Sequence, residues 1–237
     1  MLRDKPVTAI IPARGGSKGI PRKNLLKLGT DTLLERTIKF ARGAPAIDRV
    51  IVSTDDQEMY DISKRHDVAA PTLRPAEHAG DQATSEAAVT HLVGQLGISD
   101  GLLLLLQVTS PLRTRGDLDR LCALYEGTPD ADAAVSLCAY SGPHPAKMLT
   151  VNDGRIAPFM DRKYTGPRQV LPEVYVLNGA FYLIDCAVFL RERTFLPERT
   201  VPFVMPEERS ANIDTQTDWQ VLQAMIAQGY WSMESYD

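Results

Sequence analysis

Residues 12–24, PARGGSKGIPRKN, combine glycines and cations in a way that suits the binding of phosphate groups. Glycines let a backbone approach a ligand, and successive N–H groups in such a turn form a concave site for anions. Five cations fall within fourteen residues, although the chain carries a net charge of −4: Arg14, Lys18, Arg22, Lys23 and Lys27. This glycine loop therefore predicts a polyphosphate site, although it matches neither the Walker pattern nor GxGxxG. A tight turn with solvated lysines is the alternative.

A second polar segment contains Arg74 and Asp81, ahead of a helix expected to begin near Thr84 or Ser85. Arg74 could reach a phosphate or a base edge, and Asp81 could accept from a ribose hydroxyl or a base amine. The alternative is a surface loop with an ordinary arginine and helix-capping residues.

A third polar segment, residues 107–113 (QVTSPLR), directly follows a continuous apolar run. Gln107 can both donate to and accept from a hydroxylated ligand. The alternative is a plain turn that ends at Pro111.

Asn212 and Asp214 stand before the last expected helix, and alternation along an extended segment puts them on the same side. Two oxygen side chains on one face can share Mg²⁺, which prefers oxygen ligands and keeps several waters. The alternative is that Asp214 helps to cap the helix that follows.

Strands separated by helices are needed to bring these four segments together. Apolar runs predict strands at Val7–Ile11, Val50–Ser53, Val68–Ala70, Leu102–Gln107 and Ala133–Leu137. Apolar residues at helical spacing lie between the runs, which indicates βαβ units and a mostly parallel sheet. We therefore predict an α/β, Rossmann-like fold with helices flanking the sheet. Ligands bind such sheets at the carboxyl ends of the strands, where we expect the four polar segments to fall.

The pattern changes after Tyr140, because residues 141–178 carry five prolines and little periodicity. A strand then follows at Ala180–Ile184, and a capping-box pattern at Thr215 to Asp218 predicts the start of the final helix. We expect one domain over residues 1–237, with a small inserted lobe at about 141–178 and around 190–200.

The composition, 44% hydrophobic and 24% charged, is typical of a soluble globular protein. The acidic balance argues against nucleic-acid binding, and the longest apolar run, Leu102–Leu106, is too short to cross a membrane. Three cysteines without a CxxC pair indicate neither a disulfide framework nor a zinc site. Because the N-terminus leads straight into a strand, we expect no signal peptide and a cytoplasmic location.

Together these segments resemble the CMP-sialic acid synthetase family, the acylneuraminate cytidylyltransferases, over about residues 6–227. The family signature near IPARGGSKGIPRKN stands unbroken at Ile11–Asn24. The RPxxLAxD segment matches with His78 in place of leucine, and LQPTSPLR matches with Val108 in place of proline. Further matches lie at His144–Lys147, Pro167–Gln169 and Asn178–Tyr182.

The resemblance implies a nucleotidyltransferase fold and a cytidylyltransferase reaction that releases pyrophosphate. CMP would pass from CTP to the anomeric hydroxyl of a nine-carbon 2-keto sugar acid of the sialic, legionaminic or pseudaminic type. It also implies Mg²⁺ or Mn²⁺ as cofactor. The inserted lobe would form a homodimer, in which aromatic residues of the partner close the sugar pocket, and Phe195 falls at that position.

The resemblance also implies residue roles. Arg14, Lys23 and Asp214 would be catalytic, and Asp214 with Asn212 would hold the metal. Backbone N–H groups at 14–19 would cradle the phosphates. The nucleotide would contact Ala13, Arg14, Gly15, Gly16, Ser17, Lys18, Gly19, Asn24, Arg74, Asp81 and Ser85. The sugar acid would contact Gln107, Thr109, Ser110, Lys147, Arg168, Asn178, Tyr182 and Phe195.

One residue departs from the family pattern, because Asn212 stands where the metal motif Asp-Ile-Asp has its first aspartate. An amide oxygen can bind Mg²⁺ but contributes no charge. Two alternatives therefore remain: a nucleotidyltransferase of the same fold that uses a different acid, and a nucleotide-binding protein with an impaired metal site. The intact cation cluster of the glycine loop argues against the second.

Overall fold

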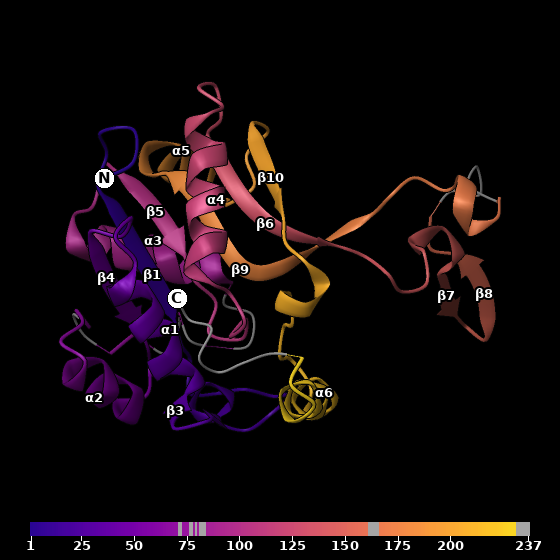
Figure 1. The fold of residues 1–237 in the computed structure, drawn as a ribbon, viewed down its shortest axis with the longest axis horizontal. Coiled ribbons are helices and arrows are strands. Elements are labelled where there is room, and N and C mark those ends of the chain that lie inside the picture. The colour runs from indigo at the N-terminus through magenta and orange to yellow at the C-terminus, as the bar shows by residue number, and fades with distance from the viewer. Residues whose placement is uncertain (71–72, 76–77, 79, 81–83, 161–165, 231–237) are drawn as a thin grey trace.

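The computed structural model describes residues 1–70, 73–75, 78, 80, 84–160 and 166–230, apart from the side chain of Arg168. A six-stranded sheet with strand order β10-β6-β9-β5-β1-β4 forms its centre (Figure 1). The strands are β1 (Val7–Pro12), β4 (Arg49–Ser53), β5 (Leu102–Leu105), β6 (Ala133–Ala139), β9 (Tyr175–Asp185) and β10 (Thr200–Val204). Within the described residues, no helix is both long and apolar enough to span a membrane.

The sheet is mostly parallel, as the sequence predicts. Strand β1 pairs in parallel with β4 and β5, and β6 pairs in parallel with β10. Strand β9 runs antiparallel to both β5 and β6, so it is the one reversed strand of this sheet. The α/β fold class is therefore confirmed.

Helices cover both faces of the sheet, so its central strands are buried on both sides. In β1, Ile11 packs with helices α1 (Leu33–Gly43) and α4 (Arg115–Glu126). Its neighbour Ile10 packs on the opposite face with α3 (Ser85–Leu96) and α5 (Cys186–Glu192). Alternation of side chains along a strand produces this division, and burial on both faces explains the continuous apolar runs.

The connections between the strands create a crevice beside β1. The chain passes from β1 through α1 to β4 on one side, and then through α2 (Gln57–Arg65) and α3 to β5 on the other. Consecutive loops therefore diverge at the carboxyl ends of β1 and β5, which is where open α/β sheets bind ligands.

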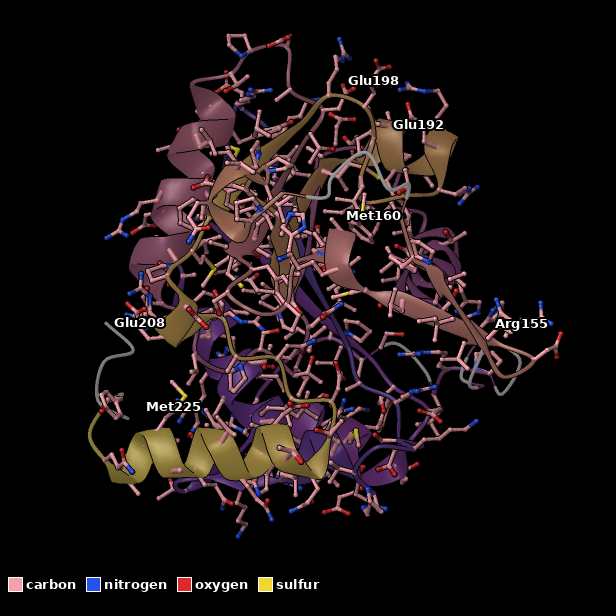
Figure 2. The ribbon with its side chains drawn as sticks, turned by 90° about the vertical axis from the view of Figure 1, so that its right-hand side faces the viewer. Arg155, Met160, Glu192, Glu198, Glu208 and Met225 are labelled. Atoms are coloured by element: carbon pink, nitrogen blue, oxygen red, sulfur yellow. The ribbon has the colours of Figure 1, made fainter. Side chains whose placement is uncertain are left out.

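Side-chain caps fix where the helices begin. The final helix, α6 (Gln216–Ala227), starts after Thr215, whose hydroxyl accepts from the Asp218 amide while the Asp218 carboxylate accepts from the Thr215 amide. The predicted capping box is therefore confirmed. Helix α6 runs across the lower edge of the body, with Met225 along it (Figure 2).

Residues 140–160 and 166–174 project from the sheet as an arm (Figure 1). It carries the hairpin of β7 (Leu149–Asn152) and β8 (Arg155–Pro158), and the short helices η3 (Pro145–Lys147) and η4 (Arg168–Val170). Asp153 and Gly154 both have positive φ, 50° and 72°, as a two-residue hairpin turn requires. Seen from the arm side, Arg155 and Met160 mark this projection (Figure 2).

Two expectations about the fold are wrong. The region around 190–200 does not belong to the inserted lobe, because β10 is a strand of the main sheet and Phe195 is buried against α5 and β9. The strand expected at Val68–Ala70 is reduced to a single bridge between Ala69 and Ile51. A small ribbon of β2 (Lys27–Leu28) and β3 (Asp31–Thr32) leads into α1.

A buried carboxylate joins helix α4 to the segment after β10. The Asp117 side chain has no exposed surface, caps the amide of Thr114 and accepts from Arg209 at 2.7 and 3.0 Å. Burial acts to raise the pKa of Asp117, but the hydrogen bonds from Arg209 and Thr114 outweigh it and hold the pKa below its usual range.

We expect Asp117→Ala to lower the free energy of unfolding by about 3 kcal/mol, because Arg209 loses its buried partner. Urea denaturation at pH 7 measures this, and the exposed Asp119→Ala on the same helix should change stability by less than about 0.5 kcal/mol.

The effect should also depend on pH in a defined direction. Since the folded pKa of Asp117 is lowered, its contribution is fully present above the unfolded value of about 4 and is lost as the pH falls through the folded value. A difference between wild type and Asp117→Ala that stays constant down to pH 2 would contradict this explanation.

Candidate active site

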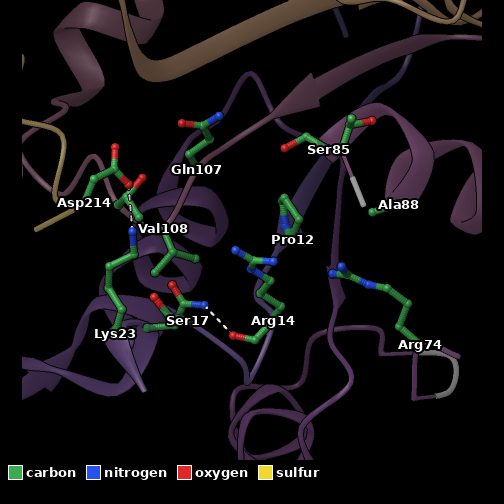
Figure 3. Close-up of a pocket in the computed structure, with 13 residues that line it drawn as sticks. Pro12, Arg14, Ser17, Lys23, Arg74, Ser85, Ala88, Gln107, Val108 and Asp214 are labelled. Carbon is green, nitrogen blue, oxygen red and sulfur yellow. Dashed lines mark hydrogen bonds and ion pairs between the residues drawn. The ribbon is translucent and has the colours of Figure 1, made fainter. Parts of the chain in front are cut away.

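A cleft of about 260 Å³ opens at the carboxyl ends of β1 and β5 (Figure 3). It is lined by nine of the residues expected from the sequence: Arg14, Ser17, Lys23, Asn24, Arg74, Ser85, Gln107, Thr109 and Asp214. Four other lining residues are not among the expected ones: Pro12, Thr84, Ala88 and Val108. All four polar segments of the sequence therefore contribute to a single cleft.

Two side-chain hydrogen bonds hold the glycine loop, one to Asp55 outside the loop and one from Asn24 at its end. The Gly15 N–H donates to Asp55 Oδ1 at 2.9 Å, and Asn24 Nδ2 donates to the Arg14 carbonyl at 3.0 Å. Since Asp55 occupies the Gly15 amide, that amide does not face the cleft. The expectation that all N–H groups from 14 to 19 cradle phosphate is corrected at this position.

Acidic residues after β4 also fix the cations of the loop. Arg22 has a left-handed backbone (φ 52°), and its guanidinium pairs with Asp56 at 3.4 Å and Glu58 at 2.7 Å. Arg22 therefore points away from the cleft and serves the conformation of the loop. Asp55 and Asp56 are not among the residues expected from the sequence. They could have been found by the same signal as the other segments, because they are polar residues that follow a predicted strand, Val50–Ser53.

Lys23 and Asp214 meet across the cleft, and the dashed line in Figure 3 joins them. Lys23 Nζ lies 2.8 Å from Asp214 Oδ1, and the lysine side chain is 13% exposed whereas the aspartate side chain is 63% exposed. The ammonium group is thus sheltered, while the carboxylate faces the solvent. Residues 191 positions apart in the sequence form the most direct contact between the glycine loop and the segment before α6.

A glycine is required where these two segments touch. A Cβ placed on Gly19 would lie 2.0 Å from the main-chain oxygen of Asp214, which cannot move without its own backbone. By contrast, a Cβ on Gly16 would meet nothing within 4 Å. Close backbone approach therefore explains Gly19 better than a direct ligand contact does.

Arg74 lies buried at the other side of the cleft. Its guanidinium donates to the Ser53 carbonyl and, at 3.1 Å, to Ser53 Oγ, and it points toward Arg14 (Figure 3). Burial lowers the pKa of Arg74, Asp55 opposes this shift, and Arg14 adds to it. Two guanidinium groups facing one cleft provide a strong positive potential for an anionic ligand.

The turn Gln107–Ser110 forms one wall of the cleft and packs closely against Gly179 of β9. A Cβ on Gly179 would lie 2.3 Å from Gln107 Oε1 and 2.5 Å from Ser110 Oγ, and Gly179 has φ of 75°. Ser110 is buried, and its hydroxyl donates to the Asn178 carbonyl at 2.8 Å. Gln107 thus lines the cleft, whereas Ser110 is used inside the protein and not by a ligand.

Asn212 and Asp214 lie on the same side, as alternation predicts. Asn212 Nδ2 donates to Asp214 Oδ2 at 3.0 Å. Asn212 Oδ1 is buried and, among the described residues, receives no hydrogen bond. No group of three or more His, Cys, Asp and Glu side chains in the described part of the chain could hold a metal. A cation here would therefore need phosphate or water oxygens beside Asp214 and Asn212, which is how Mg²⁺ is commonly bound.

Besides Ser110, three further residues expected to contact the sugar lie in the protein interior. Phe195 is 2% exposed and packs against Phe189 and Tyr182, with ring centroids 4.8 and 6.0 Å apart. Burial raises the pKa of Tyr182 to about 12. Asn178 is 2% exposed, and its amide is hydrogen bonded within the protein. The assignment of Phe195 to a partner's pocket is therefore wrong, and Tyr182 and Asn178 are not free to bind a sugar in this conformation.

The other expected residues are placed as follows. Lys147 lies in η3 on the arm and not at the cleft of its own chain. Ala13 is a core residue, and Gly16 and Lys18 lie at the exposed surface of the glycine loop. Asp81 and the Arg168 side chain are outside the described residues.

Comparison with known proteins defines the class. A cytidylyltransferase family model matches residues 8–134, which is more than half of the chain. The chain therefore belongs to the cytidylyltransferase family.

Individual relatives show which members of this family the chain is similar to. The chain is 33% identical over 220 residues to an N-acylneuraminate cytidylyltransferase of Streptococcus agalactiae, an alignment that covers 91% of the chain. It spans about half, 52%, of the length of that relative. A pseudaminic acid cytidylyltransferase of Campylobacter jejuni is 29% identical over 215 residues, which is 88% of this chain and 91% of the relative. These names agree with the resemblance seen in the sequence.

Solved structures support the fold. The structure of a CMP:2-keto-3-deoxy-manno-octonic acid synthetase complexed with CTP matches with a TM-score of 0.68. The match covers 94% of this chain and 99% of the other at 17% identity, so it supports the architecture alone.

We expect Gly19→Ala to weaken CTP binding at least tenfold, because the new methyl group must push the glycine loop away from the Asp214 main chain. Isothermal titration with CTP measures this. Gly94→Ala is the matched control, since Gly94 lies exposed on α3 and a Cβ there meets nothing within 4 Å. Equal CTP affinity in Gly19→Ala and wild type would show that the close approach is not needed.

Proposed function

We propose that the chain transfers CMP from CTP to the anomeric hydroxyl of a nine-carbon 2-keto sugar acid and releases pyrophosphate. The observation that carries the proposal is that Arg14 and Lys23 of the glycine loop meet Asp214 at one cleft, at the carboxyl ends of β1 and β5. The relatives named for sialic and pseudaminic acids support this choice of acceptor.

The residues of the cleft would act mainly by positioning the two substrates and by stabilising the negative charge of the phosphates. Arg14 and Lys23 would offset the negative charge that builds on the phosphates as pyrophosphate leaves in line with the attacking hydroxyl. Arg74 and Ser85, at the opposite side of the cleft, would hold the cytidine. Gln107 would orient the sugar acid from the turn after β5.

Asp214 and Asn212 would hold Mg²⁺ or Mn²⁺ together with phosphate oxygens. The buried Asn212 Oδ1, which lacks a donor among the described residues, supports this assignment. A bound cation would polarise the α-phosphate and lower the pKa of the attacking hydroxyl. Lys23, paired with Asp214 in this structure, would then turn to the phosphates.

We also propose that the active form is a homodimer built through the arm. The arm exposes large apolar side chains that the chain itself does not cover: Leu149, Val151, Ile156, Phe159, Met160 and Val170. Lys147 lies on this arm, so it would reach a sugar carboxylate only in the cleft of a second copy.

We also propose a cytoplasmic location. The three cysteines are free thiols, which suits a reducing compartment.

The decisive experiment measures pyrophosphate release with CTP and Mg²⁺ against sialic, legionaminic and pseudaminic acids, and against sugar acids of other kinds. We expect release with at least one acid. Lys23→Ala should reduce kcat at least 100-fold, because Lys23 has little exposure and faces the phosphates, with little change in Tm. Lys39→Ala is the matched control, since this exposed lysine on α1 pairs only with Asp31 among the interactions observed for it.

The outcomes separate the alternatives. Release only with an acid of another kind would indicate a same-fold nucleotidyltransferase with a different acceptor. CTP binding without release from any acid would favour a nucleotide-binding protein with an impaired metal site. Unchanged turnover in Lys23→Ala would exclude the role given to Lys23.

We expect Asn212→Asp to lower the Mg²⁺ concentration needed for half-maximal activity several-fold, because a carboxylate adds charge where Asn212 now offers an amide oxygen. A Mg²⁺ titration at saturating CTP measures this. Identical metal dependence in the two proteins would remove Asn212 from the metal site.

A further inference from the structure

The segment Met205–Asp214, here called the strap, connects β10 to α6 and ends at the cleft. Near its middle, Ser210 Oγ donates to the Pro206 carbonyl at 2.8 Å and accepts from Asn178 Nδ2 at 3.0 Å. Toward its end, the Ile213 N–H donates to the Thr109 carbonyl at 2.9 Å. The strap is therefore fastened to both β9 and the turn after β5.

Asn178 is itself fixed by an irregular part of the sheet. The register between β6 and β9 shifts so that Ser136 alone faces residues 178–181. Ser136 Oγ donates to Asn178 Oδ1 at 2.6 Å and accepts from the Phe181 N–H at 2.8 Å. The Ala180 N–H also donates to Asn178 Oδ1, at 3.2 Å. Bulges of this kind redirect side chains beside functional sites.

The same residue also holds the opposite wall of the cleft. The Asn178 carbonyl accepts from Ser110 Oγ at 2.8 Å, and Ser110 belongs to the turn that presents Gln107 and Thr109. One buried residue thus contacts the turn through its main chain and the strap through its side chain. Asn178 therefore links these two walls of the cleft.

We propose that Asn178 is a positioning residue, which sets the placement of Asn212 and Asp214 over the cleft through Ser210 and does not contact the sugar. The proposal depends on the proposed function in one respect only, which is the metal that Asn212 and Asp214 would hold. A ligand-bearing loop held by a buried hydrogen bond loses affinity when that bond is removed, commonly tenfold or more.

The test compares Asn178→Ala and Ser210→Ala with wild type. Hydrogen exchange of the Ile213 amide reports strap order without any turnover, and Mn²⁺ titration of the CTP complex reports the metal site. We expect faster exchange at Ile213 and an Mn²⁺ Kd raised about tenfold in both variants, with the sugar-acid KM at saturating metal unchanged. Ser210 is only half-buried, so Ser210→Ala keeps the test valid if Asn178→Ala fails to fold.

Ser63→Ala is the matched control. This buried serine also donates its hydroxyl to a main-chain carbonyl, that of Met59 at 2.9 Å, but the bond lies within helix α2. It should leave exchange at Ile213 and the Mn²⁺ Kd unchanged. A raised sugar-acid KM in Asn178→Ala with unchanged exchange and Mn²⁺ Kd would overturn the proposal and make Asn178 a sugar ligand.

Failure of the proposed function is distinguishable from failure of this inference. If wild type binds no Mn²⁺ with CTP, the metal assignment fails, and exchange at Ile213 alone decides the positioning role. Faster exchange in Ser210→Ala then supports that role, and unchanged exchange overturns it.

Discussion

The divergence of the chain on the two sides of β1 is the constraint on which the site depends. Because β4 and β5 flank β1, the glycine loop and the turn after β5 cannot fill the space between them. The strap closes that space from a third direction, at the Gly19 and Lys23 contacts with Asp214. Each wall therefore comes from a different part of the sequence, and the walls meet only in the folded chain.

Polar groups buried behind the cleft do much of the organising. Asp117 holds Arg209 and Asn178 holds Ser210, both near the middle of the strap, and Asp55 holds the glycine loop through Gly15. None of these three lines the cleft. A buried hydrogen bond is costly to leave unmade, so such groups define one arrangement of the loops more sharply than apolar packing does.

The sequence predicts the features that depend on local pattern. Apolar runs locate β1, β4, β5 and β6, and the capping box locates α6. Most residues that line the cleft are also predictable, because they are either cations close to glycines or polar residues that follow a strand. What depends on tertiary contact escapes prediction: an aromatic residue such as Phe195 looks the same in sequence whether it faces a ligand or the core. For Asn178, only the irregular pairing of β6 with β9 reveals that its amide is already used.

The arm has a consequence for the thermodynamics of folding. A two-stranded hairpin is marginally stable by itself, and the apolar side chains of β7 and β8 gain no burial from the body of their own chain. Val151 and Ile156, for example, remain 71% and 70% exposed. In the proposed homodimer, the free energy that orders the arm would come from the surface of the second copy, so the stability of this part of the protein would depend by mass action on the concentration of the chain.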